Sequence, residues 1–254
     1  MLIAITREVS PAMNECLRTH VPRAPIDLET ARMQHSTYEA CLIKAGCAVQ
    51  RLEAGVDLPD SVFVEDVAVV LDEVAVIARP GAVSRRRETP IVATTLSRYR
   101  PLQLVESPAT LDGGDVMQIG RRVFVGRSSR TNAEGIDQLR QMLDAFGYLV
   151  QAVPVHGCLH LKSAVSAATD DTLLINRQWV PQDAFSDLVL VDVHPDEPLA
   201  ANALRIGDQV IYPSAFPKTR ERLQDQGVRV RTVDVGELAK AEGGVSCCSL
   251  IFSA

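Results

Sequence analysis

Two adjacent cysteines, Cys247 and Cys248, follow a flexible diglycine in the stretch GGVSCCSL at residues 243–250. If the stretch is extended, neighbouring side chains point to opposite faces of a strand, so the two thiols cannot easily bind one metal ion. A disulfide between them would strain the intervening peptide bond. The pattern therefore favours one nucleophile beside one packed neighbour, although a single cysteine is more often structural than reactive.

A third thiol lies between two histidines in the stretch VHGCLHLKS. In an extended segment, His156, Cys158 and His160 would share one face and could together bind a transition metal. Such spacings also arise by chance, and a metal site needs a fixed geometry and supporting hydrogen bonds. One histidine acting as both acid and base is the sharper hypothesis, because the unperturbed imidazole pKa lies near neutral pH.

Carboxylates gather in two further stretches, LPDSVFVEDVAVV and TLDGGDVM. The first contains Asp60, Glu65 and Asp66. Read as a strand, it could bury only one of the adjacent Glu65 and Asp66 side chains. In the second stretch, two glycines would let Asp112 project from a turn into a pocket. Taken alone, solvated carboxylates at a strand end explain the first stretch equally well, and an ordinary Gly-Gly turn with acidic flanks explains the second stretch better.

Bulk composition limits the function classes. The chain has 254 residues, of which 46% are hydrophobic and 23% charged, as is usual for a globular protein with a sizeable core. A net charge of −6 argues against a nucleic-acid partner. No apolar run is long enough for a membrane span, and Arg7 and Glu8 interrupt any signal-peptide core. We therefore expect a cytoplasmic protein with six reduced cysteines.

Helical periodicity and capping signals predict four longer helices, at 27–46, 84–99, 131–147 and 216–227. In the first, one face would be formed by Met33, Tyr38, Cys41 and Leu42. Ser84 and Thr131 would cap the second and third helices, although Pro90 weakens the second. Short helices are expected near 180–186 and 235–241.

Runs rich in Val, Ile and Leu predict strands at 2–5, 48–52, 61–70, 74–78, 102–106, 115–118, 122–126, 148–153, 172–176, 187–191, 203–206, 208–212, 228–232 and 245–252. A unit of hairpin, helix and strand recurs about every 45–50 residues, which is typical of a radial or solenoid array. A doubly wound fold would instead alternate single strands with helices. No linker divides the chain, so we expect one domain spanning residues 1–254.

Six stretches, in order, resemble one family, the dimethylarginine dimethylaminohydrolases of the guanidine-modifying, or pentein, superfamily. They are PDSVFVED (59–66), ARPGAVSRRRE (78–88), ATLDGGDV (109–116), VFVGRSSRTNAEG (123–135), LHLKS (159–163) and GGVSCCSL (243–250). The resemblance runs almost end to end and is looser near the N-terminus. It implies an α/β fold, a five-bladed propeller of ββαβ units with pseudo-fivefold symmetry and an active site at the central axis.

The resemblance also implies roles for single residues. Cys247 would be the nucleophile, His160 the general acid and base, and Asp112 the carboxylate beside it. The implied substrate-binding residues are Asp60, Glu65, Asp66, Arg85, Arg130, Ala241 and Glu242. Asp66 would hold the guanidinium nitrogens, and Asp60 and Glu65 would help to bind the substrate. The two arginines would receive the substrate α-carboxylate, and the backbone at 241–242 would bind the α-amino group. A flexible lid would lie near Leu17.

The implied reaction is hydrolysis of Nω-methylated arginines to citrulline and dimethylamine or methylamine, through a covalent thiouronium on Cys247. It needs a small cationic guanidine substrate and neither metal nor organic cofactor. Three alternatives stay open: an arginine deiminase or related small-guanidine hydrolase, a non-catalytic guanidine-binding module, and a zinc protein using residues 156–160. The sequence leaves open whether the chain is a monomer or a homodimer.

Overall fold

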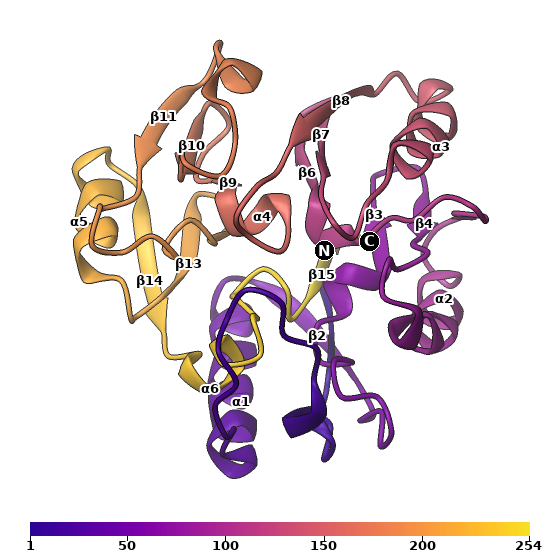
Figure 1. The fold of residues 1–254 in the computed structure, drawn as a ribbon, viewed down its shortest axis with the longest axis horizontal. Coiled ribbons are helices and arrows are strands. Elements are labelled where there is room, and N and C mark those ends of the chain that lie inside the picture. The colour runs from indigo at the N-terminus through magenta and orange to yellow at the C-terminus, as the bar shows by residue number, and fades with distance from the viewer.

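The computed structural model describes residues 1–254 and arranges fifteen strands as five separate three-stranded sheets (Figure 1). In every sheet the middle strand pairs antiparallel with one neighbour and parallel with the other. In four sheets an α-helix connects the middle strand to its parallel neighbour, and in the fifth a 3₁₀ turn at Gln182–Phe185 lies in that connection, because parallel pairing requires a crossover. The expected five-bladed α/β propeller is thereby confirmed.

The strands are β1 Leu2–Arg7, β2 Cys47–Leu52, β3 Ala68–Val70, β4 Ala75–Ile77, β5 Leu102–Leu104, β6 Val116–Ile119, β7 Arg122–Arg127, β8 Leu149–Pro154, β9 Val165–Ala167, β10 Thr172–Ile175, β11 Val189–Asp192, β12 Leu204–Ile206, β13 Gln209–Pro213, β14 Arg229–Val233 and β15 Leu250–Ser253. The α-helices are α1 Leu28–Lys44, α2 Thr89–Leu96, α3 Ala133–Asp144, α4 Leu161–Ala164, α5 Pro217–Asp225 and α6 Gly236–Ala239. The 3₁₀ turns are η1 Met13–Glu15, η2 Val64–Val67, η3 Val83–Glu88, η4 Gly113–Asp115 and η5 Gln182–Phe185.

The two ends of the chain close the ring in one blade. Strand β15 pairs antiparallel with β1, with Leu2 opposite Ser253, and the Ala254 amide donates to the Met1 carbonyl at 2.8 Å. Strand β2 then completes this sheet in parallel with β1. The C-terminal segment that carries Cys247 and Cys248 is therefore fixed against the first strand of the chain.

The predicted helices form, with different caps and faces. Asp27 caps α1 by accepting from the Glu29 and Thr30 amides, but Met33 is 62% exposed, so it does not belong to the buried face. Pro90 stands in the first turn of α2, so the predicted second helix splits into η3 and α2, and Ser84 caps neither. Asn132, rather than Thr131, caps α3 by accepting from the Gly135 amide.

Two predicted strands are mostly something else. Only Ala68–Val70 of the expected 61–70 strand is extended, because the preceding residues form η2. Only the end of the expected 245–252 strand is extended, since Cys247 and Cys248 lie in a turn before β15. Strand β9 and helix α4 were not predicted. The strand has three residues and the helix has four, so both depend on contacts with distant segments rather than on a local pattern.

Five hydrophobic clusters lie between the blades and their helices. In one of them, Ile136, Leu139 and Leu143 of α3 pack against Val123 and Val125 of β7, all five being buried. Burying each such side chain contributes about 1.5–3 kcal/mol. No helix combines the length and apolar character needed to cross a bilayer.

Candidate active site

The predicted site residues converge on one narrow cavity near the Cys247 thiol. The cavity is about 20 Å³ and is lined by Leu17, Asp60, Phe63, Asp66, Arg85, Arg130, Leu159, His160, Ala241, Glu242, Gly243 and Cys247. Eight of the ten predicted residues are in this lining. Asp112 lies behind His160, and Glu65 does not line the cavity. The structure thus gathers residues from distant parts of the chain at one place.

The 3₁₀ turn η2 brings both Glu65 and Asp66 into the interior. Their exposures are 9% and 3%, so the expectation that only one of them could be buried is wrong. That expectation assumed a strand, in which neighbours face opposite sides, whereas a 3₁₀ turn rotates them by only about a third of a turn. Asp66 reaches the cavity, while Glu65 bonds Lys162 and, at 2.9 Å, the Ser246 hydroxyl.

His160 lies between two carboxylates. Its Nε2 is 3.0 Å from Asp112 Oδ2 and its Nδ1 is 3.6 Å from Asp66 Oδ1. A Cβ at Gly114 would come within 2.6 Å of both Asp66 Oδ1 and His160 Nδ1, so a glycine is required where the Asp112 turn passes the imidazole. The glycines of TLDGGDVM therefore serve a close backbone approach.

These carboxylates make His160 a cation at neutral pH. Burial by itself would lower the pKa of the imidazole, but Asp66, Asp112 and Asp115 outweigh it and raise the pKa to about 9. Hydrogen bonding to the charged form and nearby opposite charge both favour protonation. The ring can therefore give up a proton to a leaving group at neutral pH.

The two adjacent cysteines differ in environment. Cys247 is half-buried and lines the cavity, whereas Cys248 is buried in the hydrophobic core and its thiol donates to the Gly244 carbonyl at 3.6 Å. Burial, followed by the charges of Glu65 and Asp66, raises the pKa of the Cys247 thiol to about 12. The predicted division into one cavity thiol and one packed thiol holds, although a turn rather than a strand produces it.

The two arginines at the cavity are held differently. Arg85 is buried and its guanidinium already bonds Asp66, Glu88 and the carbonyls of Asp60 and Phe63. Arg130 is half-buried, and its only side-chain contact within hydrogen-bonding distance is Thr19 Oγ1 at 3.5 Å. Arg130 is therefore the freer of the two guanidinium groups.

Asp115 is a supporting residue that the sequence analysis passed over. Its Oδ1 accepts from the Leu161 amide at 2.8 Å, next to His160. Its Oδ2 accepts from the hydroxyls of Ser128 and Thr131, and the Thr131 hydroxyl in turn accepts from the Asp112 amide. The third residue of the Gly-Gly-Asp turn was the available signal, because this buried carboxylate links the segments that carry His160 and Asp112.

The suggested metal trio does not form. Gly157 has φ +72, so the segment is not extended, and His156 is exposed while Cys158 and His160 are buried. Nowhere in the structure do three or more His, Cys, Asp or Glu side chains form a group that could hold a metal ion.

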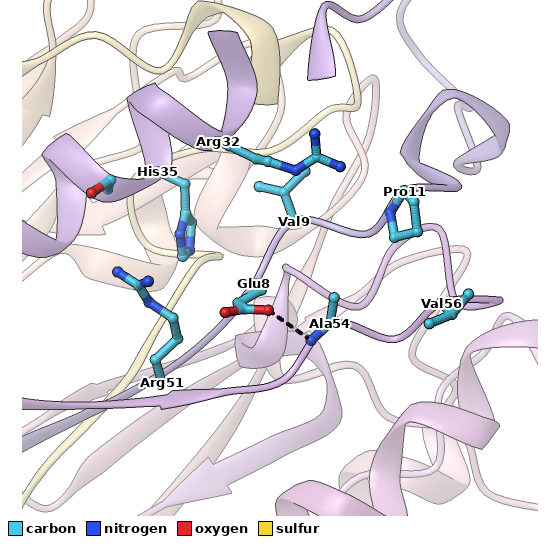
Figure 2. Close-up of a pocket in the computed structure, with 9 residues that line it drawn as sticks. Glu8, Val9, Pro11, Arg32, His35, Arg51, Ala54 and Val56 are labelled. Carbon is cyan, nitrogen blue, oxygen red and sulfur yellow. Dashed lines mark hydrogen bonds between the residues drawn. The ribbon is translucent and has the colours of Figure 1, made fainter. Parts of the chain in front are cut away.

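Of two larger cavities, one adjoins the site and the other lies apart from it. One of about 220 Å³ also reaches Cys247 and is largely apolar, with Trp179, Leu199, Phe216 and Val235 in its lining. Another, of about 400 Å³, lies at the N-terminal half of α1 and the ends of β1 and β2, where His35, Arg51 and Glu8 face it (Figure 2). It contains none of the predicted site residues.

Comparisons with known proteins show what the chain is similar to. The arginine deiminase family model matches residues 55–192. A Streptomyces coelicolor dimethylarginine dimethylaminohydrolase is 42% identical, covering 97% of this chain and 95% of its own, and the Pseudomonas aeruginosa enzyme of the same name is 37% identical, covering 89% and 90%. The solved structure of a mutant of the Pseudomonas aeruginosa enzyme, complexed with citrulline, is similar to this one with a TM-score of 0.93 at 34% identity, and the match covers 98% of each chain. The chain therefore belongs to the dimethylarginine dimethylaminohydrolase family.

Proposed function

We propose that this protein hydrolyses Nω-methylated arginines, asymmetric dimethylarginine and monomethylarginine, to citrulline plus dimethylamine or methylamine. One observation carries the proposal: a thiol, an imidazole and a buried carboxylate lie together beside a cavity lined by further carboxylates and arginines. The relatives' names and the citrulline complex of a relative support the same reaction.

The substrate would be held at both ends. A guanidinium is a planar cation, and paired hydrogen bonds to Asp66 and Asp60 would fix its plane. The α-carboxylate would be received by Arg130, with Arg85 contributing from its fixed position. Backbone groups of Ala241 and Glu242 would accept from the α-amino group, and Glu65 would act indirectly by holding Ser246, the neighbour of Cys247.

Catalysis would begin with ionisation of the thiol. The bound guanidinium brings a positive charge that lowers the pKa of Cys247, and the thiol proton leaves to solvent because His160 already carries a proton. The thiolate then attacks the central guanidinium carbon. His160 protonates the departing amine, which would otherwise be a very poor leaving group, and Asp112 stabilises and orients the imidazolium.

Hydrolysis of the covalent thiouronium would complete the cycle. The imidazole, now neutral, takes a proton from water, and the resulting hydroxide attacks the same carbon. His160 is thereby protonated again, and the carbon–sulfur bond breaks as the added hydroxyl group loses its proton to solvent, which releases citrulline and the thiolate. The reaction depends on a reduced thiol, and all six cysteines are free, which supports work in a reducing compartment such as the cytoplasm.

The direct test is to measure citrulline and the released amine from methylated and unmodified arginines. We expect dimethylamine or methylamine in equal amount to citrulline. Ammonia released from unmodified arginine at a higher kcat/KM would identify an arginine deiminase instead, and tight binding with no citrulline would identify a binding module. Cys247→Ser should abolish turnover and Cys248→Ser should keep most of it; the reverse result would overturn the nucleophile assignment.

A further inference from the structure

Residues 17–25, which we call the covering loop, form an irregular segment over the site. Leu17 lines the narrow cavity with Cys247, and His20 and Val21 line the adjoining apolar cavity. At the base of the loop, the Asn14 side chain and the Ile26 backbone exchange two hydrogen bonds, of 3.0 and 2.8 Å. The loop therefore covers both cavities that reach the thiol.

One carboxylate holds the tip of this loop. Glu242 accepts from three consecutive backbone amides, those of Thr19 at 2.9 Å, His20, and Val21 at 2.8 Å. Hydrogen bonds to an ionised carboxylate are roughly twice as strong as neutral ones. Glu242 also lines both cavities, so these contacts lie directly at the mouth of the site.

The backbone at Glu242 makes this choice of residue informative. Its φ is +62, and it is the one residue other than glycine with a positive φ in the chain. That conformation is disfavoured for residues with a Cβ, and a turn of this kind ordinarily uses glycine or asparagine. Because the backbone alone would favour glycine here, the side chain itself must be what the position uses.

We propose that Glu242 is a positioning residue whose carboxylate holds the covering loop closed over Cys247. The narrow cavity, at about 20 Å³, is far smaller than an amino acid needs, so substrate entry and product release require the loop to move. Breaking the three amide contacts would permit that movement. The kinetic consequences rest on the proposed function, whereas the movement of the loop can be measured without turnover.

Hydrogen exchange of the free protein tests the contact itself. In Glu242→Ala and Glu242→Gly, the amides of residues 19–21 should exchange at least about tenfold faster than in the wild type, and trypsin should cleave faster at Arg18 and Arg23. Glu242→Gln should be intermediate, because its amide nitrogen cannot accept hydrogen bonds. Glu242→Gly should also unfold at a temperature no lower than the wild type, since glycine adopts the positive φ freely.

The matched control is Glu237→Gln. Glu237 lies in the same segment and accepts from the Asp27 amide, beyond the other end of the loop, at 2.9 Å. This variant should leave exchange at residues 19–21 unchanged. Unchanged exchange at these residues in both Glu242→Ala and Glu242→Gly would overturn the proposal, because the turn alone would then hold the loop.

Kinetics give the second readout. With a methylarginine substrate, Glu242→Ala should raise KM about tenfold or more and speed citrulline dissociation, while single-turnover formation of the covalent adduct at saturating substrate stays close to wild type. Loss of that single-turnover rate with KM unchanged would contradict a positioning role. If no methylarginine is turned over, the proposed function fails, but exchange and cleavage still decide whether Glu242 holds the loop.

Discussion

The protein buries two histidines next to carboxylates, and the two imidazoles acquire opposite properties. His35, in the outer cavity of Figure 2, and His160, at the central cavity, are 3% and 4% exposed, so burial does not distinguish them. His35 Nδ1 lies 3.8 Å from Glu39, and burial followed by Arg51 lowers its pKa despite that carboxylate. His160 has its pKa raised to about 9.

The difference lies in the balance of carboxylates and cations around each imidazole. Glu39, which also accepts from the Thr6 hydroxyl, raises the pKa of His35, but burial together with its own partner Arg51 outweighs it. At His160, Asp66 is likewise paired with Arg85, but Asp112 has no arginine or lysine partner and Asp115 adds a further carboxylate, so the carboxylates prevail. A buried histidine becomes a proton donor only where its neighbouring carboxylates exceed the neighbouring cations.

The largest contrast should appear in turnover. His160→Gln should lower kcat by about 10³-fold or more, because no group then protonates the departing amine, while a covalent adduct still forms slowly with a better leaving group. His35→Gln should leave kcat per folded molecule near the wild type. Steady-state rates and intact-protein mass spectrometry measure both. Comparable losses of kcat in the two variants would contradict the difference in role between His160 and His35.

Variants of Asp112 and Glu39, the carboxylates next to the two histidines, should also differ in their effect on turnover. Asp112→Asn removes the charge that orients and stabilises the His160 imidazolium, so kcat should fall by about 10²-fold or more with little change in thermal stability. Glu39→Gln leaves the Arg51 pair incomplete, so it should lower the melting temperature and leave kcat nearly unchanged. An Asp112 variant with wild-type kcat would remove the carboxylate from the mechanism.

These assignments show where sequence reasoning reached the site and where it stopped. The convergence of Cys247, His160 and Asp112 was predictable only through the resemblance, because six motifs in order are specific although each motif alone has an ordinary structural explanation. The joint burial of Glu65 and Asp66 was not, because a single 3₁₀ turn cannot be told from a strand by a short apolar run. Thr131 looked like a helix cap, but its hydroxyl is drawn to Asp115, a contact set by tertiary structure.

The fold shows the same limit. The repeating hairpin, helix and strand indicated a radial or solenoid array, since hydrophobic period and turn residues are local signals, and the resemblance supplied the five blades. Helix α4, directly after His160, has four residues and no side-chain cap. Its position depends on the Asp115 bond to the Leu161 amide, which no local pattern encodes.

A smaller effect is expected at the carboxylate end of the substrate. Arg130→Ala should lower kcat/KM by about ten- to hundredfold, chiefly through KM, because it removes a charge-assisted hydrogen bond. Methylguanidines without an α-carboxylate should be poor substrates for the wild type and lose little more in the variant. Equal losses for both substrate types would assign Arg130 to the fold. Arg85→Ala is the less clean variant, since Arg85 also neutralises Asp66 and Glu88.

At Cys247 the expected effect of ligand binding is a change in the ionisation of the thiol rather than in a reaction rate. Since burial and nearby carboxylates raise the pKa of Cys247 to about 12, the free enzyme should carry a thiol at neutral pH. Binding of an unreactive guanidinium ligand should lower that pKa and release a proton, which ultraviolet absorbance of the thiolate can follow. If Cys247 were already fully ionised in the free enzyme at about pH 6, and ligand binding did not change this, a preformed thiolate–imidazolium pair would be indicated instead.

The most direct test is an NMR titration of the imidazole resonances in the free enzyme, with His35→Gln and His160→Gln used to assign them. We predict that His160 titrates near pH 9 and is protonated at neutral pH, whereas His35 titrates below its ordinary value of 6.5. If His160 were neutral at pH 7, or if His35 titrated at a higher pH than His160, the charge balance proposed for the active site would be wrong.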